Sequence, residues 1–164
     1  MDNTLLYDID FLTWTEEQAA ALRTLASRRD LSNALDLKNV IEEIEALGRY
    51  ELNSATNPIR LILEHLLKVV FDPESNAQRH WRGEIRVWHV DVLEELTPSM
   101  HRKIELDPLW RSAVAHARGQ LQERDLSLPR WLPESCPFTL QDFLMPEFDI
   151  NGAVARLSEP PAEG

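Results

Sequence analysis

Residues 37–69 form the longest continuous helical pattern in the chain. Steps of four and three residues connect one seam of positions along it: Leu37, Ile41, Ile44, Gly48, Glu51, Ala55, Pro58, Ile62, His65 and Val69. This spacing puts every member on one face of an α-helix. The seam keeps its phase through Pro58, although proline removes one helical hydrogen bond and clashes with the preceding turn. The pattern therefore predicts one continuous helix of about 50 Å, kinked at Pro58. The alternative is a hairpin in which Asn57 caps a second helix and Pro58 is its first residue.

The remainder of the chain also has a helical pattern. It has only five glycines, and no Asn-Gly or Asp-Gly turn joins two alternating apolar runs, so β-hairpins are not expected. Helix starts are expected at Asp10 or at a Thr15–Gln18 capping box, at Asp36 and at Thr139. Further helices are predicted over residues 76–96, 98–105 and 108–124.

These elements predict an all-α fold. We expect a single helical bundle of about five to six helices over residues 1–150, with one long Pro-kinked helix and a short C-terminal helix. Two adjacent prolines and a terminal glycine predict that residues 151–164 form a flexible tail.

The charge balance limits the classes of partner that the chain is expected to bind. The chain has 164 residues, with 17 Lys and Arg against 28 Asp and Glu, for a formal net charge of −11. Nucleic-acid binding draws its affinity from basic residues that neutralise phosphates, so no nucleic acid is expected as a partner. No apolar run is long enough to span a bilayer, no basic leader precedes an apolar stretch, and a single cysteine, Cys136, excludes a disulfide framework. A cytoplasmic protein without a membrane partner is expected.

Five segments in order resemble one protein family: Tyr7-Asp8-x-Asp10-Phe11-x-x-Trp14, Glu42-Glu43-Ile44-Glu45-x-Leu47-Gly48, His65-Leu66-Leu67-Lys68, Trp81-Arg82 and Pro133-Glu134-x-Cys136-Pro137-Phe138-Thr139-Leu140. Together they are similar to the bacterial domain of unknown function number 29, over about residues 4–146. The resemblance implies an all-helical bacterial protein and supplies no catalytic residues. The chain departs from the family pattern at Pro58.

A polar pocket is one hypothesis for a functional site. His65 falls inside the apolar arc of the long helix, Glu51 lies on the same seam, and Glu43 flanks it, so all three are candidates to face the interior. Arg60, Glu64 and Lys68 are expected on the side of the helix opposite His65. A straight helix would separate Glu51 from His65 by about 21 Å, which weakens a shared site. The favoured structural interpretation is a core histidine with a satisfied hydrogen bond and a Glu51 that reaches the rim.

A metal site is a weaker hypothesis. His80 and Glu84 stand four residues apart, on one helix face, and Asp91 lies two turns further on. No His-Glu-x-x-His, Glu-x-x-His, phosphate-binding glycine loop or nucleophile elbow is present, so the sequence assigns no cofactor and leaves enzymatic activity uncertain. Cys136 is expected to be a packed thiol rather than a nucleophile.

The helix predicted over residues 76–96 is apolar on more than one side. Trp81, Ile85 and Trp88 lie on one stripe, whereas Val87, Val90 and Leu93 lie off it. Such a helix is either central to the bundle or shared with a second subunit. The leading hypothesis is therefore a non-enzymatic module that binds a protein partner or itself, as a homo-oligomer, through Val87, Val90 and Leu93. The alternative is a metal-binding or hydrolytic enzyme that uses a His/Glu pocket in the bundle core.

Overall fold

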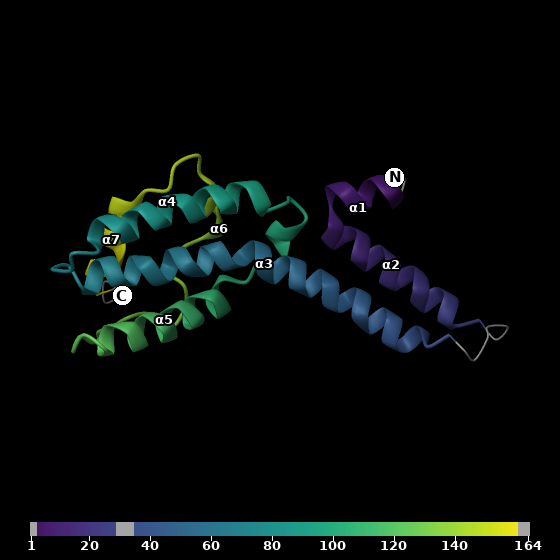
Figure 1. The fold of residues 1–164 in the computed structure, drawn as a ribbon, viewed down its shortest axis with the longest axis horizontal. Helices are drawn as coiled ribbons and strands as arrows, with labels where there is room; N and C mark the ends of the chain where they lie inside the picture. The colour runs from purple at the N-terminus through teal and green to yellow at the C-terminus, as the bar shows by residue number, and fades with distance from the viewer. Residues whose placement is uncertain (1–2, 29–34, 161–164) are drawn as a thin grey trace. The chain divides into compact units, whose positions relative to one another are not determined.

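A computed structural model of the chain describes residues 3–28 and 35–160 (Figure 1). All the regular structure within these ranges is helical, which confirms the all-α prediction. The elements are α1 (Asn3–Ile9), α2 (Phe11–Ala26), α3 (Leu37–Phe71), α4 (Gln78–Glu95), a 3₁₀ turn (Met100–Arg102), α5 (Leu106–Gln122), α6 (Leu140–Leu144) and α7 (Ile150–Ser158).

Helix α3 is continuous from Leu37 to Phe71, with Pro58 inside it. The continuous-helix prediction is confirmed and the hairpin alternative is wrong. Asp36 caps the helix as expected, because its carboxylate accepts from the backbone N–H of Asn39 at 3.3 Å. The size of the bend at Pro58 stays a prediction.

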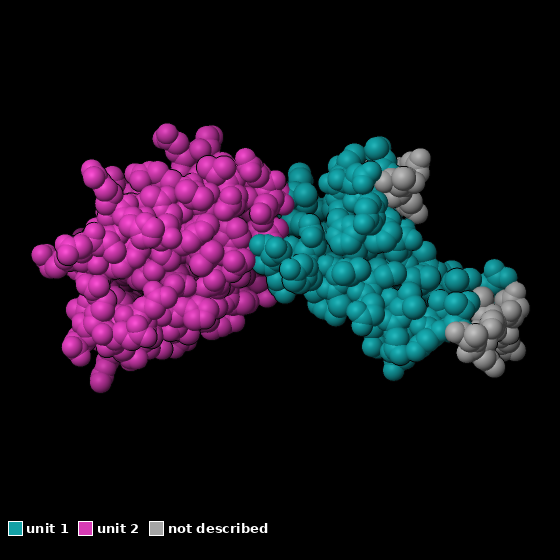
Figure 2. Space-filling model, viewed as in Figure 1, with its two compact units in different colours: residues 1–54, 97–103 teal, residues 55–96, 104–164 magenta. Residues whose placement is uncertain are grey.

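The chain divides into two compact units, which Figure 2 shows in teal and magenta. Unit 1 comprises residues 1–54 and 97–103, and unit 2 comprises residues 55–96 and 104–164. The prediction of one bundle domain over residues 1–150 stays a prediction.

In unit 1, Asp10 organises the start of α2. Its carboxylate accepts from the backbone N–H and the hydroxyl of Thr13, at 3.0 and 2.8 Å, and from the Ser99 hydroxyl at 3.0 Å. Asp10 is therefore the N-cap, and the Thr15 capping box is wrong: the Thr15 hydroxyl donates to the Leu12 carbonyl inside the helix. Helices α2 and α3 approach closely at Gly48, where an added Cβ would clash with the Thr15 hydroxyl oxygen.

In unit 2, residues 55–71 of α3 lie in the middle. Helices α4 and α5 flank this part of α3 on opposite sides (Figure 1). Its apolar side chains are accordingly buried: Ile59, Ile62, Leu63, Leu66, Leu67 and Val69. The sequence raised α4 as a candidate for the central helix, and the structure gives that place to α3.

The segment after α5 wraps over unit 2 and returns through two short helices. Trp110 of α5 anchors the segment, because its indole N–H donates to the Pro133 carbonyl at 2.8 Å. Thr139 and Asp142 then form a capping box at α6, as the predicted start at Thr139 requires. The prediction of a tail from residue 151 is wrong for residues 151–158, which belong to α7 and bury Ala153 and Leu157.

None of the helices within residues 3–28 and 35–160 combines the length and the apolar character that a membrane crossing requires.

Candidate functional site

The second half of α3 carries polar side chains into a buried environment. Arg60, Glu64 and Lys68 follow one another at intervals of four residues, and His65 lies beside them. The helical wheel placed Glu64 and Lys68 opposite the buried seam, but they are only 4% and 6% exposed. The prediction failed because α4 and α5 cover both sides of the helix, and because Lys68, three residues after His65, lies only about 60° from it around the helix.

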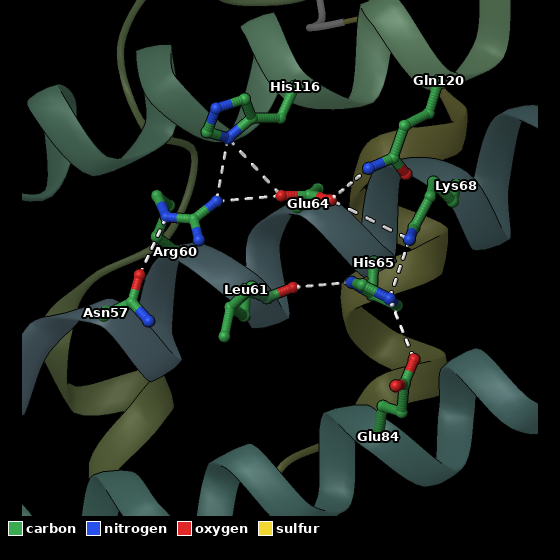
Figure 3. Close-up of polar contacts among 9 residues, drawn as sticks. All are labelled: Asn57, Arg60, Leu61, Glu64, His65, Lys68, Glu84, His116 and Gln120. Atoms are coloured by element: carbon green, nitrogen blue, oxygen red, sulfur yellow. Dashed lines mark hydrogen bonds and ion pairs between the residues drawn. The ribbon is translucent and has the colours of Figure 1, made fainter. Parts of the chain in front are cut away.

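Glu64 receives contacts from α3 and α5 (Figure 3). Its carboxylate accepts from the Arg60 guanidinium and from the Gln120 amide, both at 2.9 Å. The Lys68 ammonium lies 3.9 Å away, and Nδ1 of His116 lies 3.6 Å away. A buried carboxylate is tolerated only with such partners, because the loss of hydration costs several kcal/mol per ion.

His65 connects Glu64 and its partners to α4. Its Nδ1–H donates to the Leu61 carbonyl at 3.1 Å, which leaves Nε2 as the acceptor in the neutral ring. The Lys68 ammonium donates to Nε2 at 2.7 Å, and a carboxylate oxygen of Glu84 lies 3.0 Å from the same atom. The Trp88 ring meets the imidazole edge to face, with centroids 4.5 Å apart. We call Arg60, Glu64, His65, Lys68 and Glu84 the buried network.

Burial favours the neutral form of His65. It lowers the pKa of His65 below the ordinary value of 6.5, and the neighbouring Lys68 ammonium lowers it further, against the opposing effect of Glu84 and Glu64. Burial also lowers the pKa of Lys68, against the attraction of the same two carboxylates. With His65 neutral, two cations face two carboxylates and the buried network carries no net charge.

The arrangement binds three helices together, and His65 and Lys68 are only 7% and 6% exposed. One ring nitrogen of His65 meets both an ammonium and a carboxylate, which would suit proton exchange. However, four grooves in the described parts of the chain are lined by other residues than His65 and Lys68. The geometry therefore fits a structural role for the network better than a catalytic one.

The other two residues of the predicted polar pocket do not join His65. Glu43 is exposed and Glu51 is half-buried, and both belong to the part of α3 in unit 1. Neither takes part in the contacts that surround His65. The three-residue pocket is thus replaced by the buried network.

The predicted metal ligands are also dispersed. Nε2 of His80 lies 3.4 Å from Glu84, but His80 is a surface residue and Glu84 shares its carboxylate with His65. Asp91 is half-buried further along α4. Within residues 3–28 and 35–160, no group of three or more His, Cys, Asp or Glu side chains is placed to hold a metal ion.

Sequence reasoning missed most of the buried network and one further histidine. The signal was available for Glu64 and Lys68. Apart from the four polar residues, all positions between 59 and 71 are apolar, and they lie on all sides of the helix. His89 is buried, with Nε2–H donating to the Phe143 carbonyl at 3.1 Å. No local pattern identified His89, because its acceptor is 54 residues away.

The single cysteine is a poor nucleophile. Burial raises the pKa of Cys136 to about 11, so the thiol is protonated at neutral pH.

Lowering the pH from about 7 to about 5 is expected to destabilise the protein through His65. The unfolded histidine takes up a proton near pH 6.5, whereas the folded one, with its lowered pKa, resists protonation. Stability from this residue is therefore complete above pH 6.5 and is lost as the pH falls toward the folded pKa. In urea unfolding at several pH values, the free energy of unfolding of His65→Gln should fall less steeply with decreasing pH than that of the wild type. The matched change His80→Gln, at a side chain 71% exposed, should keep the wild-type slope; equal slopes in all three proteins would contradict the assignment.

Comparison with known proteins agrees with the helical architecture. The family model of the domain of unknown function DUF29 matches residues 6–149. A crystal structure of an α-helical protein of unknown function from Rhodospirillum rubrum is similar to this chain, with 37% sequence identity and a TM-score of 0.76. The match covers 93% of this chain and 98% of that one. No curated protein matches the sequence.

Proposed function

The chain belongs to the DUF29 family, and for this member we propose a non-enzymatic role in the bacterial cytoplasm, as a helical module that binds a protein partner or itself through the outer face of α4. The single cysteine and the bacterial relative favour that location. A protein is the proposed partner, rather than nucleic acid, because the chain has a formal net charge of −11 and the arginines of α4 are accompanied by acidic residues on the same helix.

One observation carries the proposal: an apolar stripe on α4 faces outward. Val87, Val90 and Leu93 are 61%, 50% and 41% exposed, and we call these three residues the α4 stripe. Contiguous apolar side chains on a surface helix are typical of interaction sites.

The opposite side of α4 is held firmly in unit 2. Ile85 and Val92 are buried there, and Glu84 contacts His65 of α3. The stripe therefore lies on a helix whose orientation within the unit is set by its inner face, which limits the entropy lost on binding.

A groove borders the stripe. Its volume is about 590 Å³, and Val90 and Arg86 contribute to its lining, together with residues 146–151. This groove gives an incoming helix a depression beside the exposed apolar side chains, as in helix-in-groove recognition.

Site-specific photo-crosslinking tests the proposal. The full chain carrying Val90→p-benzoylphenylalanine, expressed in its bacterial host and irradiated, should form a covalent adduct with a protein. Adding Val87→Asp to the same chain should remove the adduct, because a charge on the stripe opposes desolvation. The matched control is the same photoreactive residue at Val40, which is 44% exposed on α3 in unit 1 and should give at most a weak background. Two further chains carry the photoreactive residue at position 87 or 93 instead. Absence of adducts from all three chains would overturn the proposal.

A further inference from the structure

The outer face of α4 is self-complementary about Val90. Val87 precedes Val90 by three residues and Leu93 follows it by three. Arg86 precedes it by four and Glu94 follows it by four, and both charged side chains are exposed. The face therefore presents the order cation, apolar, apolar, apolar, carboxylate.

A two-fold axis through Val90 would bring these groups into register. When two copies of one helix pack antiparallel about such an axis, residues at equal separations before and after the central residue face each other. Val87 of one copy then meets Leu93 of the other, and Arg86 meets Glu94. The charge pairs lie about 6 Å along the helix from the central valine contact, one on each side.

The charges on α4 are placed for an antiparallel neighbour and against the helix's own dipole. Arg79, Arg82 and Arg86 lie in its first half, together with Glu84, which contacts His65 of α3, whereas Asp91, Glu94 and Glu95 lie in its second half. The helix dipole favours the reverse distribution, with acids in the first turn and bases in the last. About a two-fold axis at Val90, the two copies of α4 overlap over residues 85–95. Within this overlap Arg86 meets a carboxylate of an antiparallel copy, whereas a parallel copy would place Arg86 against Arg86.

Arg86 and Glu94 are available for such pairing. Among the described residues, the guanidinium of Arg86 donates to the carbonyl of Arg82 at 3.2 Å and forms no ion pair, and Glu94 forms none either.

We propose that the occupant of the α4 stripe is a second copy of this chain, docked antiparallel about a two-fold axis at Val90. This inference rests on the proposed function and makes it specific, because the symmetric order of charges matches an isologous contact. An unrelated protein partner would need complementarity to the stripe but not this symmetry.

Charge reversal at the two positions tests the pairing. Sedimentation equilibrium of the purified full chain should give about twice the monomer mass of 18.9 kDa for the wild type. Arg86→Glu places carboxylate against carboxylate at both ends of the contact, and Glu94→Arg places cation against cation. Each is expected to raise the dimer dissociation constant at least about tenfold, while the double variant Arg86→Glu/Glu94→Arg restores it. An equimolar mixture of the two single variants should also dimerise, because every pair is then of opposite charge.

The results separate this inference from the proposed function. Both positions are exposed, and circular dichroism of each variant verifies that the helices are formed. The wild type should be measured up to about 100 µM, roughly a hundred times a micromolar dissociation constant. If it stays monomeric there, the proposal that a second copy occupies the α4 stripe is wrong. The adduct at position 90 would still decide the proposed function. A dimer that Val90→Asp abolishes, but that charge reversal leaves unchanged, would overturn the antiparallel register alone.

Discussion

Replacing Glu64 with leucine is expected to lower the free energy of unfolding by about 3 kcal/mol. The substitution removes the carboxylate that Arg60 and Gln120 contact at 2.9 Å and that faces the Lys68 ammonium. Lys68 is then left in the interior beside His65, with a positive charge that its burial penalises. Urea denaturation followed by circular dichroism measures the loss.

The matched double-mutant cycle tests whether the loss comes from the charge on Lys68 that Glu64 no longer balances. Lys68→Met alone should cost less than Glu64→Leu, because Glu64 retains Arg60 and Gln120. The double variant Glu64→Leu/Lys68→Met should be less destabilised than the sum of the single changes, by about 1 kcal/mol or more. Strict additivity would mean that Glu64 and Lys68 do not stabilise each other.

Replacing Trp110 with alanine is expected to cost about 3–5 kcal/mol. Trp110 is 1% exposed and is among the largest fully buried side chains. Its loss leaves a cavity under the wrapping segment and removes the hydrogen bond to the Pro133 carbonyl. The segment should loosen, so trypsin should cleave after Arg130 faster than in the wild type.

Trp110→Phe separates the hydrogen bond from the packing. It retains an aromatic ring but leaves the Pro133 carbonyl without its donor, so a smaller loss of about 1–2 kcal/mol is expected. Cleavage after Arg130 should then fall between the rates of the wild type and of Trp110→Ala. An unchanged cleavage rate in Trp110→Ala would show that the indole does not anchor the segment.

Local signals in the sequence predicted the helices where capping and periodicity agreed. Asp36 and Thr139 begin helices as expected, since each has a polar side chain directly before an apolar-periodic run. The unbroken phase through Pro58 correctly favoured one continuous helix. The same reasoning failed at α7, where Pro160-Pro161 indicated a tail, although Asp149 caps a helix by accepting from the backbone N–H of Gly152 at 2.9 Å.

The candidate site was predicted only in part. His65 was singled out because it interrupts an apolar arc, but its partners were not, because Glu84 is on α4 and lies 19 residues away along the chain. Glu64 was placed opposite the buried seam because a helical wheel assumes one buried side. Lys68 was misplaced, since a residue three positions after His65 lies on the same side of the helix. A helical segment that is apolar on every side is expected to be buried on every side, and its polar side chains must then have hydrogen-bond or ion-pair partners.

The sequence by itself determined that this chain is all-helical, where most of its helices begin, and that α3 does not break at Pro58. These properties depend on interactions between residues within a few turns of one another, which a linear pattern records. Only the tertiary structure decided that α4 and α5 cover both sides of α3, that Glu64 and Lys68 are interior, and that Val87, Val90 and Leu93 are exposed. Burial depends on how many neighbours surround a helix, and those neighbours come from distant parts of the chain.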